Sequence, residues 1–185
     1  MLEDDYCMSV NDDSISFGTK IKVRGSRTIQ QYELGHRWKL EKDSGKWVQM
    51  NEIEDSRPPQ ILFIERCLQF LDEGGRMGII LPESIFGMPK YNFIIDWLMD
   101  HTEIVGMVSM PEELFQPYTH AKACVVFLRK TRSHKVYPIH MAIAEWCGHD
   151  SKGNDTILKS SDGTSTLLDD IPTIAERLKV MNIWE

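Results

Sequence analysis

The sequence lacks paired cysteines, long apolar runs and an excess of positive charge. Its four cysteines are widely scattered and form no Cys-x-x-Cys pair, so the spacing typical of a zinc site is absent. No apolar run approaches the roughly 18–20 residues that a membrane span requires. The formal net charge is −7, which argues against a globally basic nucleic-acid binder.

The N-terminus lacks positive charge altogether. Residues 1–13 contain five acidic residues and no lysine or arginine, which excludes the basic start of a signal peptide or transit peptide. We therefore expect a cytoplasmic protein whose thiols stay reduced. Residues 1–16 are polar and acidic, without a period, and predict a poorly ordered leader.

What the chain does contain is an ordinary globular composition over 185 residues, 42% hydrophobic and 26% charged, enough for one domain with a core. Its clearest pattern starts at Pro59, where apolar residues recur at helical spacing until Gly74-Gly75 ends the helix. Phe63 and Phe70 widen this apolar stripe, and a stripe of that width predicts a helix that packs against a sheet.

The segments that follow predict an α/β fold. Met77–Leu81 is a short apolar run that suits a strand buried on both faces. We expect a helix from Glu83 or Pro89 to His101, strands over 103–111 and 122–130, an edge element within 135–148 and a helix over 172–180. Because the connection between the strands at 103–111 and 122–130 is too short for a parallel crossover, they should pair antiparallel. The predicted fold class is the second half of an open, mostly parallel sheet that ends in an antiparallel strand pair.

Residues 18–57 are predicted to be a long loop with short helical or strand pieces. From Gly18 to Trp47 there are eight lysines or arginines against three acidic residues. A local basic segment on an acidic protein can bind phosphate groups. The alternative interpretation of this segment is a solvated, charge-rich loop.

Five stretches, in order along the chain, carry a family resemblance: FGTKIKV, QYELGHRW, PPQILFIERCLQFLDEGGRMGIILPESIFG, IVGMVSMPEELFQPYTHAKACVVFLRK and HMAIAEWCGHDSKGND. Together they cover most of residues 17–155. They resemble the catalytic domain of the modification subunit of type I restriction–modification systems, which is an N6-adenine DNA methyltransferase that uses S-adenosylmethionine.

The resemblance implies a Rossmann-like (class I methyltransferase) sheet, of which this chain would form the C-terminal half. In the family, the first half of the sheet binds S-adenosylmethionine through a glycine-rich turn and an acidic residue. The fourth strand ends in Asn-Pro-Pro-Phe or Asn-Pro-Pro-Tyr, whose asparagine holds the target amine while the aromatic ring stacks on the flipped adenine.

The sequence departs from that pattern at both sites. It contains no Gly-x-Gly turn, and at the signature only Phe17 matches, because Ser14 replaces the asparagine and Ile15 and Ser16 replace the prolines. A serine hydroxyl lacks the planar amide that grips the adenine amine. We therefore predict no catalytic residue, no cofactor-binding residue and no cofactor bound by this chain alone. A gene truncation, a cassette boundary or a split gene would each produce such a sequence.

The resemblance also suggests DNA contacts. Phe17 is the candidate for base stacking, with packing on the sheet edge as the alternative. The candidates for DNA-backbone contact, by their place in the family's DNA-facing loop, are Lys20, Lys22, Arg24 and Arg27. A solvated loop is the alternative, and any DNA binding should be weak.

Two further features of the sequence bear on a ligand cleft and on a metal site. Pro82–Ser84 follows a predicted strand and would border a ligand cleft, since ligands of open α/β sheets lie beyond the carboxyl ends of the strands; a plain helix entry is the alternative. His120 and His149 have no third ligand at metal spacing, so no metal site is predicted.

Two hypotheses remain open. The chain is either a fragment of a type I methyltransferase that is catalytically incomplete alone, or a non-enzymatic module that self-associates or docks on a restriction–modification subunit. The expected partners are other restriction–modification subunits or a missing N-terminal half, a second copy in a homo-oligomer, and weakly bound DNA. The expected organisation is a leader at 1–16, half a methyltransferase domain at 17–150, and a loop with a short helix at 151–185.

Overall fold

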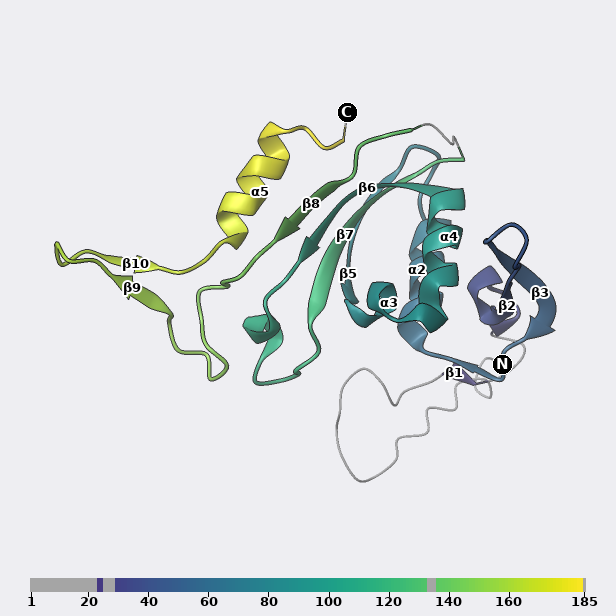
Figure 1. Ribbon diagram of the computed structural model, residues 1–185, viewed down its shortest axis with the longest axis horizontal. Helices are drawn as coiled ribbons and strands as arrows, with labels where there is room; N and C mark the ends of the chain where they lie inside the picture. The colour runs from purple at the N-terminus through teal and green to yellow at the C-terminus, as the bar shows by residue number, and fades with distance from the viewer. Residues whose placement is uncertain (1–22, 25–28, 133–135, 185) are drawn as a thin grey trace, which may run out of the picture. The chain divides into compact units, whose positions relative to one another are not determined.

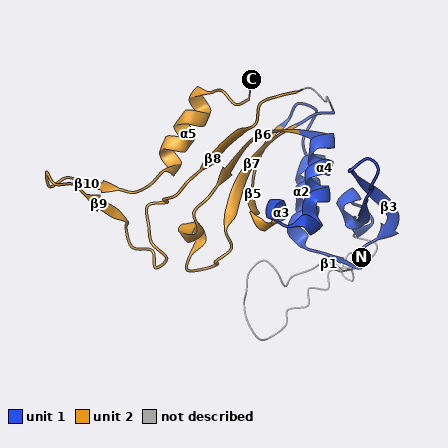
Figure 2. Ribbon diagram, in the orientation of Figure 1, with its two compact units in different colours: residues 1–75, 85–102, 130–132 blue, residues 76–84, 103–129, 133–185 orange. Residues whose placement is uncertain are grey.

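The computed structural model describes residues 23–24, 29–132 and 136–184 (Figure 1). These residues divide into two compact units (Figure 2). Unit 1 is made of residues 1–75, 85–102 and 130–132, and unit 2 of residues 76–84, 103–129 and 133–185.

The described residues of unit 1 include helices α2 and α4 and two small antiparallel strand pairs. Its helical elements are α2 (Pro59–Gln69), α4 (Asn92–His101), and the 3-10 turns η1 (Glu33–Gly35) and η2 (Pro89–Tyr91). Its strands are β1 (Val23–Arg24), which pairs with β4 (Ser56–Arg57), and β2 (His36–Leu40), which pairs with β3 (Trp47–Ile53). The short helix α3 (Ser84–Gly87) joins the two units in sequence.

Helix α2 begins and ends where the sequence predicts a boundary. Pro59 occupies the first turn, where its missing N–H is not needed. At the other end, Lys130 Nζ donates to the carbonyl oxygens of Leu68 and Leu71 at 2.9 and 2.5 Å. A lysine at this position satisfies the unpaired carbonyls of the last turn. Gly74, with φ +78°, then reverses the chain.

Unit 2 is built on a four-stranded sheet in the order β5-β7-β6-β8. These strands are β5 (Arg76–Pro82), β6 (Thr102–Ser109), β7 (Ala123–Lys130) and β8 (His140–Ile143). The remaining elements are the 3-10 turn η3 (Glu112–Phe115), the hairpin β9 (Ile157–Lys159) and β10 (Ser165–Leu167), and helix α5 (Ile171–Val180).

The strand directions are those of a mixed sheet. Strand β7 is antiparallel to β5, and β6 is parallel to β8. The end of β6 lies beside the start of β7, where the N–H of Met110 donates to the carbonyl of Ala123 at 2.9 Å, so these neighbours are antiparallel as predicted. Strands β5, β6 and β8 therefore point the same way, and the predicted fold class, a partial α/β sheet with an antiparallel pair, is confirmed.

One face of this sheet has an aromatic cover inside unit 2. Phe127 on β7 lies between Gly78 and Gly106, where a Cβ would meet the Phe127 ring at 3.6 and 3.5 Å. The Trp184 ring meets Phe127 edge-on at 6.1 Å, and Arg76 lies 5.4 Å from the centre of the Trp184 ring. The two glycines leave room for the large side chain between them.

Several predictions about burial and loops are wrong. Strand β5 alternates between partly buried and exposed positions up to the buried Leu81 and leaves Ile80 56% exposed, so it is not buried on both faces. On α2, Phe63 and Phe70 are 61% and 76% exposed, so the packed stripe is narrower than the sequence suggests. Of the two starts expected for the helix that ends at His101, Glu83 is wrong, because α3 is separate, whereas Pro89 agrees with η2, which leads directly into α4.

The region expected to be a long loop with short helical or strand pieces contains the hairpin β2–β3, whose register shifts between His36 and Trp38. Trp38, Leu40 and Trp47 are apolar residues of one face, and the charged residues between them hide the alternation that marks a strand. Gly45, with φ +68°, lies in the turn. The edge element is β8, and the C-terminal helix is confirmed as α5.

Candidate functional site

The carboxyl ends of three parallel strands meet at one edge of the sheet in unit 2. Strand β5 ends at Pro82, β6 at Ser109 and β8 at Ile143. The N–H of Ala144 donates to the carbonyl of Ser109 at 2.9 Å, which joins the last two ends. This is the edge where open α/β sheets place their ligands.

Glu83 is the centre of a polar cluster at this edge. Its carboxylate accepts the hydroxyl of Ser109 at 3.3 Å and pairs with Lys122 Nζ at 3.2 Å. The Glu83 backbone N–H donates to the carbonyl of Lys122 at 2.9 Å, which fixes the residue at the strand end. The cluster is partly exposed, and it presents to solvent one carboxylate that accepts hydrogen bonds and one ammonium that can approach phosphate.

A buried thiol lies directly behind the cluster. Cys124 Sγ donates to the carbonyl of Leu81 at 3.5 Å. Burial, and then the neighbouring charge of Glu83, raise the pKa of the Cys124 thiol to about 11. The thiol is therefore protonated at neutral pH and is a packing group, since only a thiolate is a strong nucleophile.

The loops that follow β6 and β8 enclose a wide groove of about 750 Å³. The first loop contributes Leu114–Tyr118, including the aromatic rings of Phe115 and Tyr118, and the second contributes Cys147–His149 with Lys152. Tyr118 is 86% exposed. The groove is thus an open aromatic surface with cationic and carboxylate groups beside it, and Asp155 and Asp169 supply the carboxylates.

Cys147 and His149 lie together in this groove. Cys147 Sγ is 3.7 Å from His149 Nε2, and His149 Nδ1 is 3.0 Å from the carbonyl oxygen of Asp150. Burial raises the pKa of the Cys147 thiol, so it too is not a thiolate nucleophile at neutral pH. Within the described part of the chain, no three His, Cys, Asp or Glu side chains gather as metal ligands.

Unit 1 contains a second cavity, of about 200 Å³, lined mainly by charged residues. Its buried carboxylate, Glu65, accepts the backbone N–H groups of Glu33 and Leu34 at 3.0 and 2.9 Å. Glu33 in turn accepts the indole N–H of Trp97 at 2.6 Å and lies 3.3 Å from His101 Nε2. These groups bind one another, so their contacts fix η1 to α2 and α4. We therefore do not interpret the cavity as a ligand site.

Most of the site residues suggested by the sequence lie outside the described residues. These are Phe17, Lys20, Lys22 and Arg27. Arg24 belongs to β1, where its backbone pairs with Ser56.

The prediction that Pro82–Ser84 borders a ligand cleft concerns residues that the structure describes. Pro82 ends β5, Glu83 forms the polar cluster, and Ser84 begins α3. His149 lines the groove, and it is not grouped with enough ligands for a metal.

Sequence reasoning missed Ser109, Lys122, Cys147 and the two groove aspartates. Ser109 and Lys122 could have been predicted from the sequence. Ser109 lies just before Pro111 and Lys122 just before the strand at 123–130, and ligands of open α/β sheets lie beyond the carboxyl ends of the parallel strands in general. The groove aspartates have no such signal, since isolated bridges place Asp155 beside His149 and Asp169 beside Cys147, and no periodic pattern marks these bridges.

Comparison with solved structures defines the class of fold. The chain is similar to the crystal structure described as a class I S-adenosylmethionine-dependent methyltransferase from Listeria monocytogenes, with a TM-score of 0.53 and 18% identity over 86% of this chain and 38% of that chain. The chain therefore spans well under half the length of that structure. At this identity the likeness shows the fold alone: a partial class I methyltransferase fold.

Two weaker likenesses are to type I restriction–modification proteins. One is to a chain from a study of complex assembly and conformational transition of the type I system (TM-score 0.39, 19% identity, 50% of this chain and 19% of that chain). The other is to a modification subunit of a type I restriction enzyme from Vibrio vulnificus YJ016 (TM-score 0.37, 17% identity, 58% of this chain and 30% of that chain). At these TM-scores neither supports an argument about the fold.

The family assignment comes from the sequence. The model of the N-6 DNA methylase family matches residues 30–166, which is most of the chain. The chain belongs to the N-6 DNA methylase family. No curated protein matches it, and no helix among the described residues is long and apolar enough to cross a membrane.

Proposed function

We propose that the chain is part of the modification methyltransferase of a type I restriction–modification system, which transfers a methyl group from S-adenosylmethionine to N6 of adenine in DNA. The observation that carries this proposal is the family match over residues 30–166. The polar edge formed by Glu83, Ser109 and Lys122 supports it, because it lies where this class of sheet receives ligands.

We also propose that this chain alone is catalytically incomplete. The sequence has no Gly-x-Gly turn to let backbone approach the cofactor and no Asn-Pro-Pro to hold the adenine amine. Positioning of reacting groups supplies about 7–11 kcal/mol of a barrier, so its loss would abolish transfer. Residues 17–150 would contribute the methyltransferase part, with Phe17 against a base and Lys20, Lys22, Arg24 and Arg27 against the DNA backbone.

The test is complementation. The chain would be titrated with S-adenosylmethionine in a calorimeter, alone and after co-expression with a polypeptide that carries the cofactor-binding strands of an N-6 DNA methylase. We expect no binding by the chain alone, and binding with methyl transfer to mixed-sequence DNA in the complex. Saturable micromolar binding by the chain alone would overturn the claim of incompleteness. A stable complex that transfers no methyl group would overturn the enzymatic proposal.

A non-enzymatic interaction module is the second candidate, and a specific observation favours it. Strand β5 is hydrogen-bonded to β7 on one side, and in the described part of the sheet no strand pairs with its other edge, where Ile80 is exposed. Unpaired edges with apolar side chains recruit further chains. Such a module would form homo-oligomers or bind a restriction–modification subunit.

Light scattering at tens of micromolar protein measures the oligomeric state and so tests whether the chain associates with itself. We expect a dimer or larger assembly, and Ile80→Lys should shift it toward monomer. A clean, soluble monomer of the unsubstituted chain would count against self-association and leave a different polypeptide as the partner of this edge.

A further inference from the structure

The hairpin β2–β3 carries a concentration of positive charge on an acidic protein. Residues 37–46 include four cationic side chains and two acidic ones, whereas the whole chain has a net charge of −7. The cations are Arg37, Lys39, Lys42 and Lys46. A local cationic surface of this kind orients an approaching polyanion even when the overall charge is negative.

One face of the hairpin is fixed to helix α4. The ring of Trp38 stacks on Phe93 with centroids 5.6 Å apart, and the ring of Trp47 lies 6.1 Å from Phe93 in a tilted arrangement. The backbone N–H of Trp47 donates to Asp96 Oδ2 at 3.0 Å. This face is therefore an anchor, and the hairpin is held in one position within unit 1.

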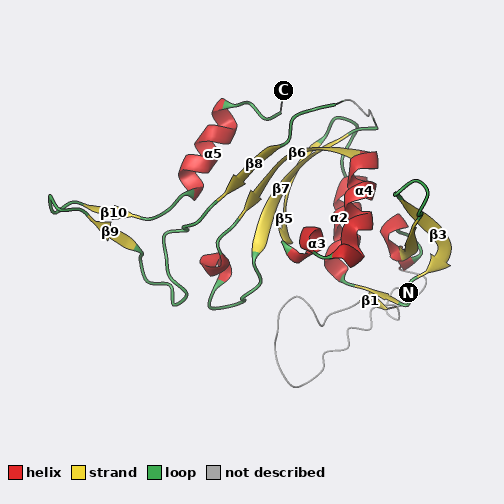
Figure 3. Cartoon of the chain, viewed as in Figure 1, coloured by secondary structure: helices red, strands yellow, loops and turns green. Residues whose placement is uncertain are grey.

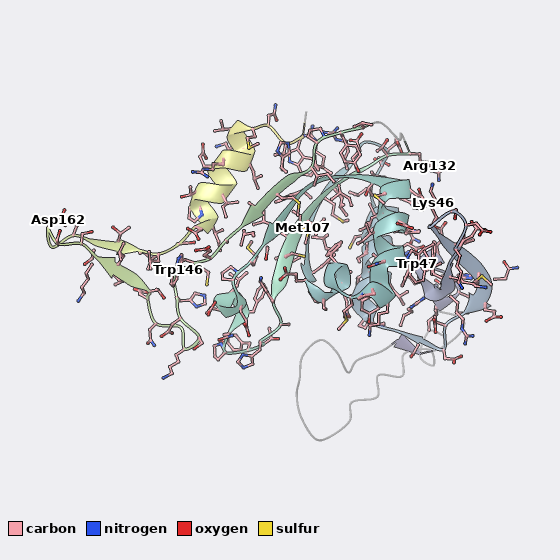
Figure 4. All side chains as sticks on the ribbon, in the orientation of Figure 1. Lys46, Trp47, Met107, Arg132, Trp146 and Asp162 are labelled. Atoms are coloured by element: carbon pink, nitrogen blue, oxygen red, sulfur yellow. The ribbon has the colours of Figure 1, made fainter. Side chains whose placement is uncertain are left out.

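The lysines are directed away from that anchor. Side chains alternate along a strand, so Lys39 on β2 points to the face opposite Trp38. Lys46 lies in the turn directly before β3, and Figure 4 labels it beside Trp47 on the hairpin. Lys42 is in the connecting turn. All three lysines are exposed.

Two of the acidic residues nearby are engaged with other groups, and the third, Asp43, is exposed in the turn beside Lys42. Glu52 pairs with Arg37 at 3.0 Å, and Glu41 accepts the hydroxyl of Ser44 at 2.6 Å. Among the described residues, none of the three lysines takes part in an ion pair. An anchored ribbon with three unpaired ammonium groups is suited to a partner that brings a row of negative charges.

We propose that Lys39, Lys42 and Lys46 form a phosphate-binding surface that holds the DNA backbone, which rests on the proposed function for the identity of the polyanion. Contacts to phosphate position a protein on DNA without reading its sequence. The surface is distinct from the candidates between residues 20 and 27, and the tryptophan anchor sets its place within unit 1.

The test measures binding to a fluorescent mixed-sequence duplex by anisotropy over a salt series, with three triple variants. K39Q/K42Q/K46Q removes the surface, K39R/K42R/K46R keeps its charge, and K90Q/K159Q/K179Q removes three exposed lysines elsewhere. Each lost phosphate contact lowers the slope of log K against log salt by about 0.9. We expect the first variant to lose roughly 2–3 units of slope and at least about tenfold in affinity at low salt, while the other two stay within about twofold of the unsubstituted chain.

Three outcomes would overturn the inference. The first is a K39Q/K42Q/K46Q variant that binds like K90Q/K159Q/K179Q while its tryptophan fluorescence shows an intact hairpin. The second is an unsubstituted chain that binds no DNA at low salt. The third is equal competition by a polyglutamate peptide, which would assign the surface to an acidic protein partner. The calorimetric complementation reports on the methyltransferase proposal independently of all three.

Discussion

Hairpins β2–β3 and β9–β10 have different supports. Hairpin β2–β3 lies against Phe93 through two tryptophan rings, and an aspartate of α4 accepts one of its backbone N–H groups. Figure 3 colours the two strands of hairpin β9–β10 yellow. Every residue of these strands is exposed, including the apolar Ile157, Leu158 and Leu167. An isolated two-stranded hairpin is only marginally stable in water, so the anchor decides how firmly each hairpin is held.

The difference shows what holds a charged segment at a fixed position. Both hairpins have polar turns with a glycine in the left-handed region, Gly45 and Gly163. Only β2–β3 adds large aromatic side chains on one face, and aromatic pairs contribute about 0.5–1.5 kcal/mol beyond the burial of their area. Its opposite face can therefore present charge at a fixed position, whereas β9–β10 has no aromatic side chain in its strands.

The largest effect should come from removing the anchor ring. Phe93 is fully buried and also lies under the guanidinium of Arg57, 4.9 Å from the ring centre. We expect Phe93→Ala to lower the free energy of unfolding by about 3–5 kcal/mol. Urea denaturation measures this loss, and hydrogen exchange should show faster exchange throughout β2–β3.

Leu158→Ala in the other hairpin is the matched control, and we expect a change within about 0.5 kcal/mol because this side chain is exposed. Equal losses in the two variants would mean that both hairpins are anchored alike.

A smaller loss is expected at the hydrogen bond between helix and hairpin. Asp96→Ala removes the acceptor of the Trp47 N–H, and a hydrogen bond to a charged group contributes about 1.5–3 kcal/mol. We expect a loss near the lower end of that range, because the bond is only partly buried. The exchange rate of the Trp47 amide reports on it directly, and Asp96→Asn should restore part of its protection. If the exchange rate of the Trp47 amide is unchanged in Asp96→Ala, the hydrogen bond does not help to hold the hairpin and the aromatic contacts are sufficient.

Sequence reasoning predicted one region of the fold better than the other. From Pro59 onward, the apolar runs are dense and each is bounded by proline or glycine, so the order of α2, β5, β6, β7 and α5 was predicted. Before Pro59, charged residues interrupt the apolar ones, and in β2–β3 the apolar residues fall on both faces: Trp38, Leu40 and Trp47 on one, Val48 and Met50 on the other. Local periodicity does not reveal strands that pack on Phe93, which lies some fifty residues further along the chain.

The candidate site was predicted only in part, for a related reason. Glu83 follows a strong apolar run and was therefore flagged as a cleft residue. Its partners Ser109 and Lys122 come from two other strands, and only the sheet order brings them to it. The exposure of Phe63 and Ile80 was not predicted, because sequence patterns indicate which side chains are apolar but not whether another segment covers them.

The two turn glycines test the coupling of each hairpin to the rest of its unit. A Cβ built at Gly45 or Gly163 meets no atom within 4 Å, so substitution costs only backbone conformation, about 1–2 kcal/mol for a left-handed L-residue. We expect Gly45→Ala to lower the unfolding free energy by about 1 kcal/mol. Gly163→Ala should leave the global value unchanged and speed amide exchange only in β9–β10. A global loss in Gly163→Ala would show that this hairpin is part of the cooperative fold.

Two carboxyl groups, one beside each hairpin, should respond to pH in opposite directions. Burial is the largest cause that raises the pKa of Glu65, which holds η1 just before β2, and two backbone N–H groups oppose this in part. The stability gained from a raised pKa is present below the unfolded-state pKa and is lost as pH rises through the folded-state pKa. The unfolding free energy of the unsubstituted chain, minus that of Glu65→Gln, should therefore fall as pH increases. A difference that rises with pH would mean that the N–H groups outweigh burial.

The smallest effect is expected at Asp162, at the tip of β9–β10 (Figure 4). Its carboxylate accepts the hydroxyl of Thr164 at 2.6 Å and the Thr164 N–H at 2.9 Å, and these bonds, the hydroxyl first, lower the pKa of Asp162. When folding lowers the pKa of a carboxyl group, the ionised group stabilises the folded structure. This stabilisation is present above the unfolded-state pKa and is lost as pH falls through the folded-state pKa. Because the group is fully exposed, we expect that loss in the turn alone: the Thr164 amide should lose protection in acid while the global unfolding curve does not move. Asp162→Asn should show no such acid transition at Thr164, since its side chain does not titrate. If acid instead shifts the global curve of the unsubstituted chain and not that of Asp162→Asn, then β9–β10 is coupled to the sheet, and its exposed strands are supported by contacts as firm as those that hold β2–β3.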